Sequence, residues 1–296
     1  MSRSSLTFPR VARSAIHRQI SERLVGLPFH AGVLEKAIAA FCRRKGVVGL
    51  YLSGSVAHGF PDVVSDIDLL VVTSDAGLKG LWDRRKQTEA SIGRVRFRLD
   101  LKEVMPTSCA AYFDNGVKLH VTYVALSHLP VEAEFRGAVR LFGEHPALIE
   151  WASACESEQR LLDVDGLKAQ DERFWFWLLQ GAAKIGRGEL WAAFDTLHVL
   201  RTIIVSFTHA ARGSVPQGYR RLEVSWDEAS LHNLRGTIAQ VREGSLRGAY
   251  SSIAGLYEAV RREVSARFGV RWRVSRGGIE FVHARLLEWL GEHPQS

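Results

Sequence analysis

The sequence has 296 residues, of which 46% are hydrophobic and 24% are charged, so it can form one or two ordinary hydrophobic cores. Its 39 basic and 32 acidic residues give a net charge of +7, which favours an anionic ligand. Because these charges are interspersed, a nucleic-acid partner is allowed but not indicated. The three scattered cysteines predict neither a disulfide framework nor a zinc site and suit the cytoplasm. No apolar run approaches the ~20 residues of a membrane span, and the first residues lack a signal-peptide core, so we expect no membrane segment.

The first third of the chain predicts helices and strands in alternation. Apolar spacing indicates helices over 11–27 and 31–45, and the uninterrupted apolar run 47–52 is typical of a buried strand. A Ser53-Gly54-Ser55 turn follows, with about one helical turn after it and a loop at Pro61. Residues 66–72 form a second apolar strand, 77–92 a helix, and 95–104 and 117–126 two further strands.

Two carboxylates open the second strand. Asp66 and Asp68 are two residues apart, so in a strand they share one face, with Cα atoms about 6.6 Å apart at a rise of about 3.3 Å per residue. Such a pair repels itself unless a cation lies between its members, and oxygen ligands at a strand end suit Mg²⁺. Upstream, Gly54 allows a close backbone approach and Ser55 adds a hydroxyl, which are the features that a phosphate needs.

At these residues the chain resembles a known superfamily. Gly54-Ser55, ten intervening residues and then Asp66-x-Asp68 are similar to the signature of the nucleotidyltransferases typified by DNA polymerase beta, especially their small antibiotic-modifying members. The resemblance implies a Mg²⁺-dependent transferase whose catalytic and metal-binding acids include Asp66 and Asp68. It also implies that Gly54, Ser55 and Ser65 bind a nucleotide, with ATP as the donor.

The same resemblance implies a third carboxylate from a neighbouring strand, which shares one of two Mg²⁺ ions and accepts a proton. Asp100 is the acid placed within the strand 95–104, so we expect it to be that catalytic and metal-binding residue. The alternation in this strand predicts that Phe97 and Leu99 are buried and that the charged side chains face outward. Two alternatives stay open: Asp100 pairs with a strand arginine, or His120 of the strand 117–126 is the base.

After residue 150 the hydrophobic period changes from 2 to 3.6, so we place a domain boundary there. The predicted architecture is α+β: a nucleotidyltransferase domain over 1–150, with a small mixed sheet flanked by helices, and an α-helical bundle over 151–296. The expected helices of the bundle span 171–187, 189–210, 226–243, 246–268 and 279–292.

The segment Gly181–Val205 resembles the helical domain of aminoglycoside and lincosamide nucleotidyltransferases. The resemblance implies that this domain selects the acceptor and that Lys184 contacts the nucleotide phosphates, although from the residues themselves we favour a solvated helix end for Lys184. Arg201 lies on an apolar stripe and therefore needs an anion, for which we favour a buried acid over the nucleotide.

Together these features predict an enzyme that transfers AMP from ATP to a hydroxyl of a small molecule such as an aminoglycoside- or lincosamide-like antibiotic. Two other functions remain: transfer to a protein or tRNA, and a catalytically silent protein that binds a partner. The sequence does not distinguish oligomeric states or acceptors, because fold does not fix function.

Overall fold

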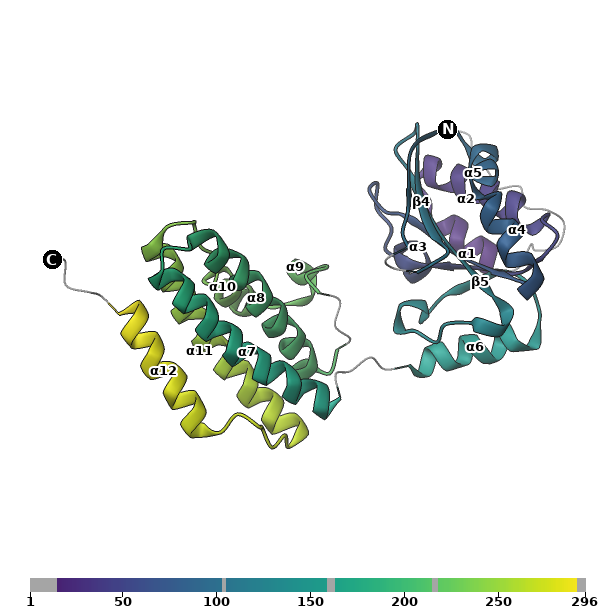
Figure 1. The fold of residues 1–296 in the computed structure, drawn as a ribbon. Coiled ribbons are helices and arrows are strands. Elements are labelled where there is room, and N and C mark those ends of the chain that lie inside the picture. The colour runs from purple at the N-terminus through teal and green to yellow at the C-terminus, as the bar shows by residue number, and fades with distance from the viewer. Residues whose placement is uncertain (1–14, 103–104, 159–162, 215–217, 292–296) are drawn as a thin grey trace. The chain divides into compact units, whose positions relative to one another are not determined.

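The computed structural model describes residues 15–102, 105–158, 163–214 and 218–291, and it divides into two compact units, Met1–Glu158 and Gln159–Ser296 (Figure 1). The sequence placed the boundary near residue 150, which falls inside α6 (Pro146–Ser157). Leu148 and Trp151 of α6 pack with residues of the sheet in the first unit, so this whole helix is part of that unit.

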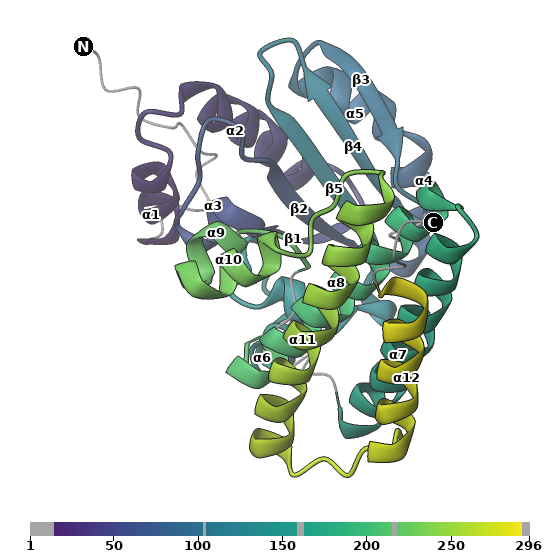
Figure 2. The same cartoon turned by 90° about the vertical axis from the view of Figure 1, so that its left-hand side faces the viewer.

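The first unit is built around a six-stranded mixed sheet with the order β3-β4-β5-β2-β1-β6, and Figure 2 shows most of these strands side by side. The pairing of β2 with β5 is parallel and the other pairings are antiparallel. The strands are β1 (Val47–Ser53), β2 (Ile67–Thr73), β3 (Val95–Asp100), β4 (Ser108–Phe113), β5 (Lys118–Ala125) and β6 (Val139–Phe142).

The helices of this unit lie before, between and after the strands. The second predicted helix is present as α2, which has Pro28 in its first turn and buries a run of apolar side chains. The helix expected over 77–92 is interrupted at Arg84 and forms two shorter helices. The helices besides α6 are α1 (Ala15–Arg23), α2 (Pro28–Cys42), α3 (Gly54–His58), α4 (Leu78–Asp83) and α5 (Arg85–Ile92).

The two faces of the sheet differ in what covers them. One, which we call the helix-covered face, packs Leu69, Val121 and their neighbours against α2, α4 and α5. On the other, the open face, Leu70 and Val124 are covered by α6 and the segment around Phe135. The remainder of the open face carries polar residues and exposed apolar side chains.

The alternation predicted for β3 is present, but its orientation is the reverse of the one expected. Phe97 and Leu99 are 60% and 51% exposed on the open face, whereas Arg98 and Asp100 lie toward α5. The reason is that β3 is an edge strand whose charged residues meet charged partners on α5, so ion pairs rather than apolar burial set its inner face.

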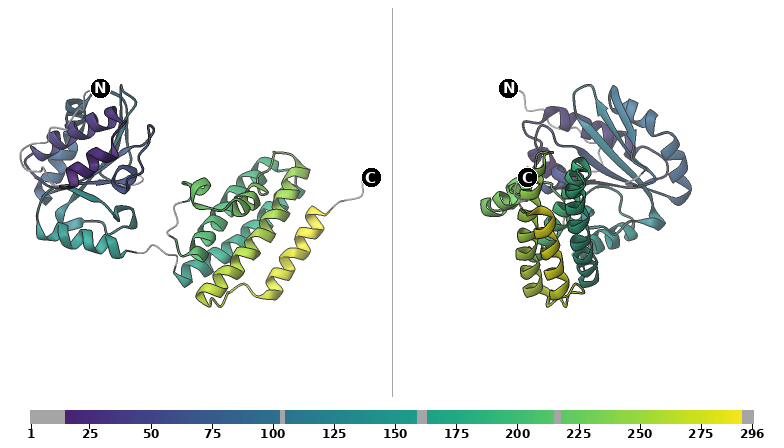
Figure 3. Two further views of the ribbon diagram at one scale, coloured as in Figure 1. Left: turned by 180° about the vertical axis from the view of Figure 1, so that it is seen from behind. Right: turned by 60° about the vertical axis from the view of Figure 1, so that its left-hand side comes forward.

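The second unit is a helical bundle, as predicted, and Figures 1 and 3 show its long helices running alongside one another. The helix expected over 226–243 is wrong in part, because it ends at Arg235, where Gly236 and the buried Thr237 begin an irregular segment. The helices are α7 (Val164–Gly186), α8 (Leu190–Arg212), α9 (Leu222–Ser225), α10 (Glu228–Arg235), α11 (Glu243–Phe268) and α12 (Arg276–Leu290).

The core of the bundle lies between α7, α8 and α11. By length and hydropathy alone α8 would suffice to cross a membrane, but here its buried side chains, among them Leu197, Leu200 and Ile204, are part of this core. Helices α7 and α11 approach so closely that a Cβ at Gly181 would lie 1.8 Å from the Tyr250 hydroxyl oxygen. Glycine is therefore required at position 181 for this packing.

Candidate active site

The strand–turn–strand motif predicted from the sequence is formed by β1, α3 and β2. Gly54 follows β1 directly and has a φ of +67°, a left-handed conformation that glycine adopts without strain. A Cβ at this position would lie 2.1 Å from Oδ2 of Asp68, so the glycine turn and the acid touch. The structure thus places the Gly54 turn against one of the two acids, and phosphate binding by this turn stays a prediction.

The strand β5 supplies a basic group beside each acid. In the parallel pairing Asp68 lies opposite His120, and His120 Nδ1 is 3.2 Å from Asp68 Oδ1. Two residues earlier in each segment, the Lys118 ammonium at the start of β5 forms an ion pair with Oδ2 of Asp66, which directly precedes β2. The two carboxylates stay 32% and 26% exposed, respectively, so both remain accessible.

His120 is held from its other side. Its Nε2 lies 2.7 Å from the hydroxyl oxygen of Ser108, which is fully buried on β4 and also 3.1 Å from the Thr122 hydroxyl oxygen. The sequence had identified His120 as an alternative base but had missed Lys118 and Ser108. The signal for Lys118 was available, because it is two residues before His120 and therefore shares its strand face.

Asp100, the expected third carboxylate, does not join the acidic pair. Register pairs Asp100 with Cys109 and Cys109 with Val121, on the helix-covered face, whereas Asp68 and His120 lie on the open face. A bidentate ion pair holds Asp100 instead: Arg85 Nε and Nη2 donate to its two oxygens at 3.0 and 2.7 Å. The prediction of Asp100 as a catalytic and metal-binding residue is corrected on this ground.

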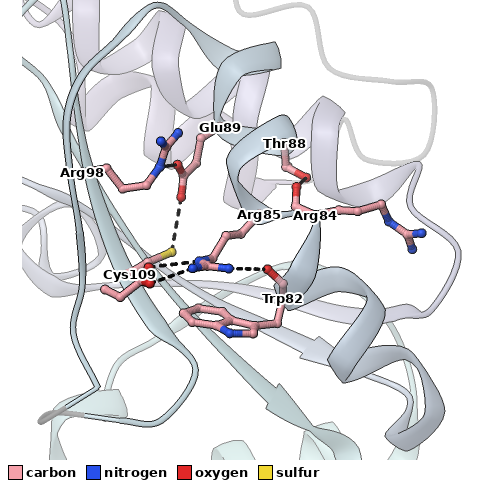
Figure 4. Close-up of polar contacts among 8 residues, drawn as sticks. Trp82, Arg84, Arg85, Thr88, Glu89, Arg98 and Cys109 are labelled. Atoms are coloured by element: carbon pink, nitrogen blue, oxygen red, sulfur yellow. Dashed lines mark hydrogen bonds and ion pairs between the residues drawn. The ribbon is translucent and has the colours of Figure 1, made fainter.

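Figure 4 shows the surroundings of Arg85 on the helix-covered face. Its guanidinium lies over the Trp82 ring, 3.9 Å from the ring centroid, and donates to the Trp82 carbonyl oxygen at 3.0 Å. Nearby, the buried Glu89 is bonded by Arg98 and accepts a hydrogen bond from the Cys109 thiol. These contacts fasten α4 and α5 to β3 and β4, so this charged cluster has a structural role.

Asp100 gives a pH-dependent stability that its replacement should remove. The Arg85 hydrogen bonds hold the pKa of Asp100 below its usual value, so its stabilising effect is present above the unfolded-state pKa of about 3.9 and is lost as pH falls through the lower, folded-state pKa. We expect the parent to lose more unfolding free energy than Asp100→Asn between about pH 5 and about pH 2. Urea unfolding at several pH values checks this, and parallel curves would contradict it.

Three side chains that sequence inspection missed position the turn. Arg23 of α1 donates to the carbonyl oxygens of Val56 and Ala57 near the C-terminal end of α3, where a cation is favourable. His58 bridges two carbonyl oxygens, with Nδ1 2.6 Å from that of Gly54 and Nε2 3.0 Å from that of Arg136. The loop before Asp66 is fastened by the buried His30, whose Nε2 is 2.9 Å from the Ser65 carbonyl oxygen.

The remaining predicted residues have different outcomes. Ser55 follows Gly54 in the first turn of α3, and its carbonyl oxygen accepts from the amides of Gly59 and Phe60. The Ser65 hydroxyl donates to Asp62 Oδ1 at 3.0 Å and accepts from the Asp62 amide, so it stabilises the loop. A phosphate contact by either serine stays a prediction.

Two basic residues of the second unit have partners there. Lys184 donates to the Thr196 hydroxyl at 2.9 Å, and a contact with nucleotide phosphates stays a prediction. Arg201 donates to the Thr237 carbonyl oxygen at 2.9 Å, so the partner found is a backbone oxygen rather than the buried acid that we favoured.

The acidic pair fits a hard divalent cation. Carboxylate oxygens are ligands that Mg²⁺ prefers, Mg²⁺ keeps several waters, and substrate phosphates complete its shell. Asp66 and Asp68 would hold the ion, and the Gly54 turn lies against Asp68. No group of three or more His, Cys, Asp or Glu residues suited to a metal occurs in the part of the chain that the structure describes.

Gly54→Ala is expected to lower nucleotidyl transfer by about 100-fold, because the new Cβ displaces the Asp68 carboxylate and misplacements of about 1 Å cost that much. It should also cost about 1–2 kcal/mol of unfolding free energy, since alanine is strained at positive φ. Gly116→Ala is the matched control, with a φ of +83° and nothing within 4 Å of a Cβ. Equal transfer rates in the two variants would contradict the contact with Asp68.

A family model of the nucleotidyltransferase domain matches residues 34–115, which include the turn and both acids. No curated protein sequence matches the chain. Among solved structures, similarity is found to an aminoglycoside 6-adenyltransferase from Bacillus subtilis, with a TM-score of 0.44, 11% identity and coverage of 88% of this chain and 97% of that one.

Two further structures are also similar. A nucleotidyltransferase-like protein from Exiguobacterium sibiricum has a TM-score of 0.39 and 10% identity, over 83% of this chain and 77% of that one. A CCA-adding enzyme has a TM-score of 0.34 and 11% identity, over 90% of this chain and 72% of that one. The family model covers 82 of the 296 residues, so similarity to the nucleotidyltransferase domain is found for residues 34–115, which contain the Gly54 turn and both acids.

Proposed function

We propose that this protein transfers AMP from ATP to a hydroxyl group of a small molecule, such as an aminoglycoside- or lincosamide-like compound. The observation that carries the proposal is the contact of the Gly54 turn with the Asp68 carboxylate, beside Asp66. A phosphate-binding turn against paired acids is what nucleotidyl transfer requires, because this chemistry depends on positioning and charge neutralisation. The free cysteines support our placing the activity in the cytoplasm.

In the proposed reaction the acceptor oxygen forms a bond to the α-phosphorus of ATP. The bond from that phosphorus to the β-phosphate oxygen breaks, and pyrophosphate leaves with the electron pair. The turn at Gly54 and the Ser55 hydroxyl would hold the terminal phosphates, while Asp66 and Asp68 would hold the divalent ion. When bound, this ion lowers the pKa of the acceptor hydroxyl and neutralises phosphate charge.

The acceptor hydroxyl also gives up a proton. Of the two residues that the sequence suggested for it, Asp100 lies on the helix-covered face and is bound by Arg85, while His120 lies beside Asp68. This arrangement favours the alternative with His120 over that with Asp100. The Gly54 turn, Asp68 and His120 come from α3, β2 and β5 of the first unit.

The test is incubation of the protein with Mg²⁺ and each of the four nucleoside triphosphates against a panel of aminoglycosides, lincosamides, tRNA and cell protein. We expect mass spectrometry to find an AMP adduct on a small molecule, with ATP as the donor. Adducts confined to tRNA or protein would transfer the proposal to that acceptor class. Absence of any adduct, together with no binding of Mg²⁺-ATP in calorimetry, would favour a catalytically silent, partner-binding protein.

A further inference from the structure

The site contains two acids and, facing them, two basic side chains. Because β2 and β5 are parallel and in register, the Asp68–His120 pair has the Asp66–Lys118 pair as its neighbour on the same open face. Each acid therefore meets a basic side chain from β5 at the position where a further acidic ligand would have to lie. Lysine has three N–H donors and no acceptor, so Lys118 cannot bind a metal while it is protonated.

The oxygens of the two carboxylates are divided between these partners and the glycine turn. Asp66 uses Oδ2 for Lys118, and Asp68 uses Oδ1 for His120. Oδ2 of Asp68 is the oxygen that lies against Gly54, on the side of the expected phosphates. One oxygen of each acid is thus left for a cation, which is enough for one ion that completes its shell with phosphate and water.

A second ion lacks ligands. Paired ions in phosphoryl-transfer sites lie roughly 3.5–4 Å apart and need bridging and terminal oxygen ligands. Asp100 is on the helix-covered face, and the residues that the structure describes contain no cluster of three or more metal-ligating side chains here or elsewhere. The positive charge that a second ion would bring is already supplied at Asp66 by the ammonium group of Lys118.

We propose that this site binds a single divalent ion through Asp66 and Asp68, and that Lys118 and His120 occupy the side of the acids where a second ion would bind. This inference rests on the proposed nucleotidyl transfer and replaces the two ions expected from the sequence. Lys118 is then a positioning residue that neutralises and orients Asp66.

The experiment counts Mn²⁺ ions by electron paramagnetic resonance in the full-length protein mixed with equimolar α,β-methylene-ATP, which cannot transfer AMP. As Mn²⁺ is added, the signal of free ions is expected to rise after one equivalent is bound per protein–nucleotide complex. His120→Asp supplies a carboxylate beside Asp68 and is expected to raise the count to two. His120→Asn, similar in size but without the charge, is the matched control and should stay at one.

The outcomes separate the ion count from the function. Two ions in the parent, seen as a second equivalent and as magnetic coupling between neighbouring Mn²⁺ ions, would overturn the single-ion site while leaving nucleotidyl transfer in place. If the His120→Asp variant folds but still binds only one ion, then the residues on β5 are not what prevents a second ion from binding, and that part of the proposal is overturned. Failure of the parent to retain nucleotide would refute the proposed function itself. If His120→Asp does not fold by circular dichroism, the count in the parent still decides.

Discussion

Asp68→Asn is expected to lower the rate of nucleotidyl transfer by at least about a thousandfold, with little change in the fold. Asparagine keeps the size of the side chain but removes the negative charge that lies against the Gly54 turn. Loss of an outer partner of a metal site already costs about 10–100-fold, and loss of a direct carboxylate ligand should cost more. The measurement is the rate of adduct formation with the acceptor found in the panel, together with calorimetric affinity for Mg²⁺-ATP.

The matched control for this variant is Asp100→Asn, which makes the same chemical change on the opposite face of the sheet. Because Asp100 is engaged by Arg85, its replacement should affect stability while leaving transfer within about twofold, as expected for a residue away from the reacting groups. A rate for Asp68→Asn within about tenfold of the parent would refute the metal-binding role. An equally large loss in Asp100→Asn would restore Asp100 as a catalytic residue.

Asp171→Asn is expected to destabilise the helical unit by about 3–5 kcal/mol, the usual cost of removing one member of a buried ion pair. Asp171 on α7 is fully buried, and Arg261 on α11 donates to both of its oxygens, at 2.6 and 3.0 Å. Tyr257 and Trp175 also donate to it, at 2.8 and 3.1 Å. Asparagine would leave the Arg261 charge without its counter-charge among apolar side chains.

Guanidinium unfolding followed by tryptophan fluorescence measures this loss, since most of the eight tryptophans lie in the second unit. Asp195→Asn on the exposed side of α8 is the control, and it should change the unfolding free energy by less than about 0.5 kcal/mol. If Asp171→Asn also changes the unfolding free energy by less than about 0.5 kcal/mol, the ion pair with Arg261 contributes no net stability relative to its neutral replacement.

A single-ion site requires that the negative charge of the two acids be compensated in part by a protein side chain. Two carboxylates and the Lys118 ammonium carry a net charge of −1, whereas three carboxylates carry −3, so one divalent ion gives this site the same net charge of +1 that two ions give a three-carboxylate site. In this proposal the residues on β5 decide the metal content, although the residues that resemble the nucleotidyltransferase motif lie on β1, α3 and β2.

The sequence alone determined the features that depend on short stretches of chain. The turn at Gly54, the shared face of Asp66 and Asp68, and the helical second unit follow from φ preferences and from side-chain periods of 2 and 3.6. These patterns are complete within a few residues, so neighbouring chain segments do not change them. The same holds for the α+β class, which follows from the change of period near residue 150.

Only the tertiary structure decided which residues meet across strands. The sequence shows that β3 alternates, but which of its faces is buried depended on its ion pairs with Arg85 and Glu89 of α5, which the alternation of the strand itself does not reveal. For that reason Asp100 was assigned to the wrong face, and Lys118 and Ser108 were missed. Strand order and register arise from pairing between distant segments, and a shift of one residue transfers every side chain to the other face of the sheet.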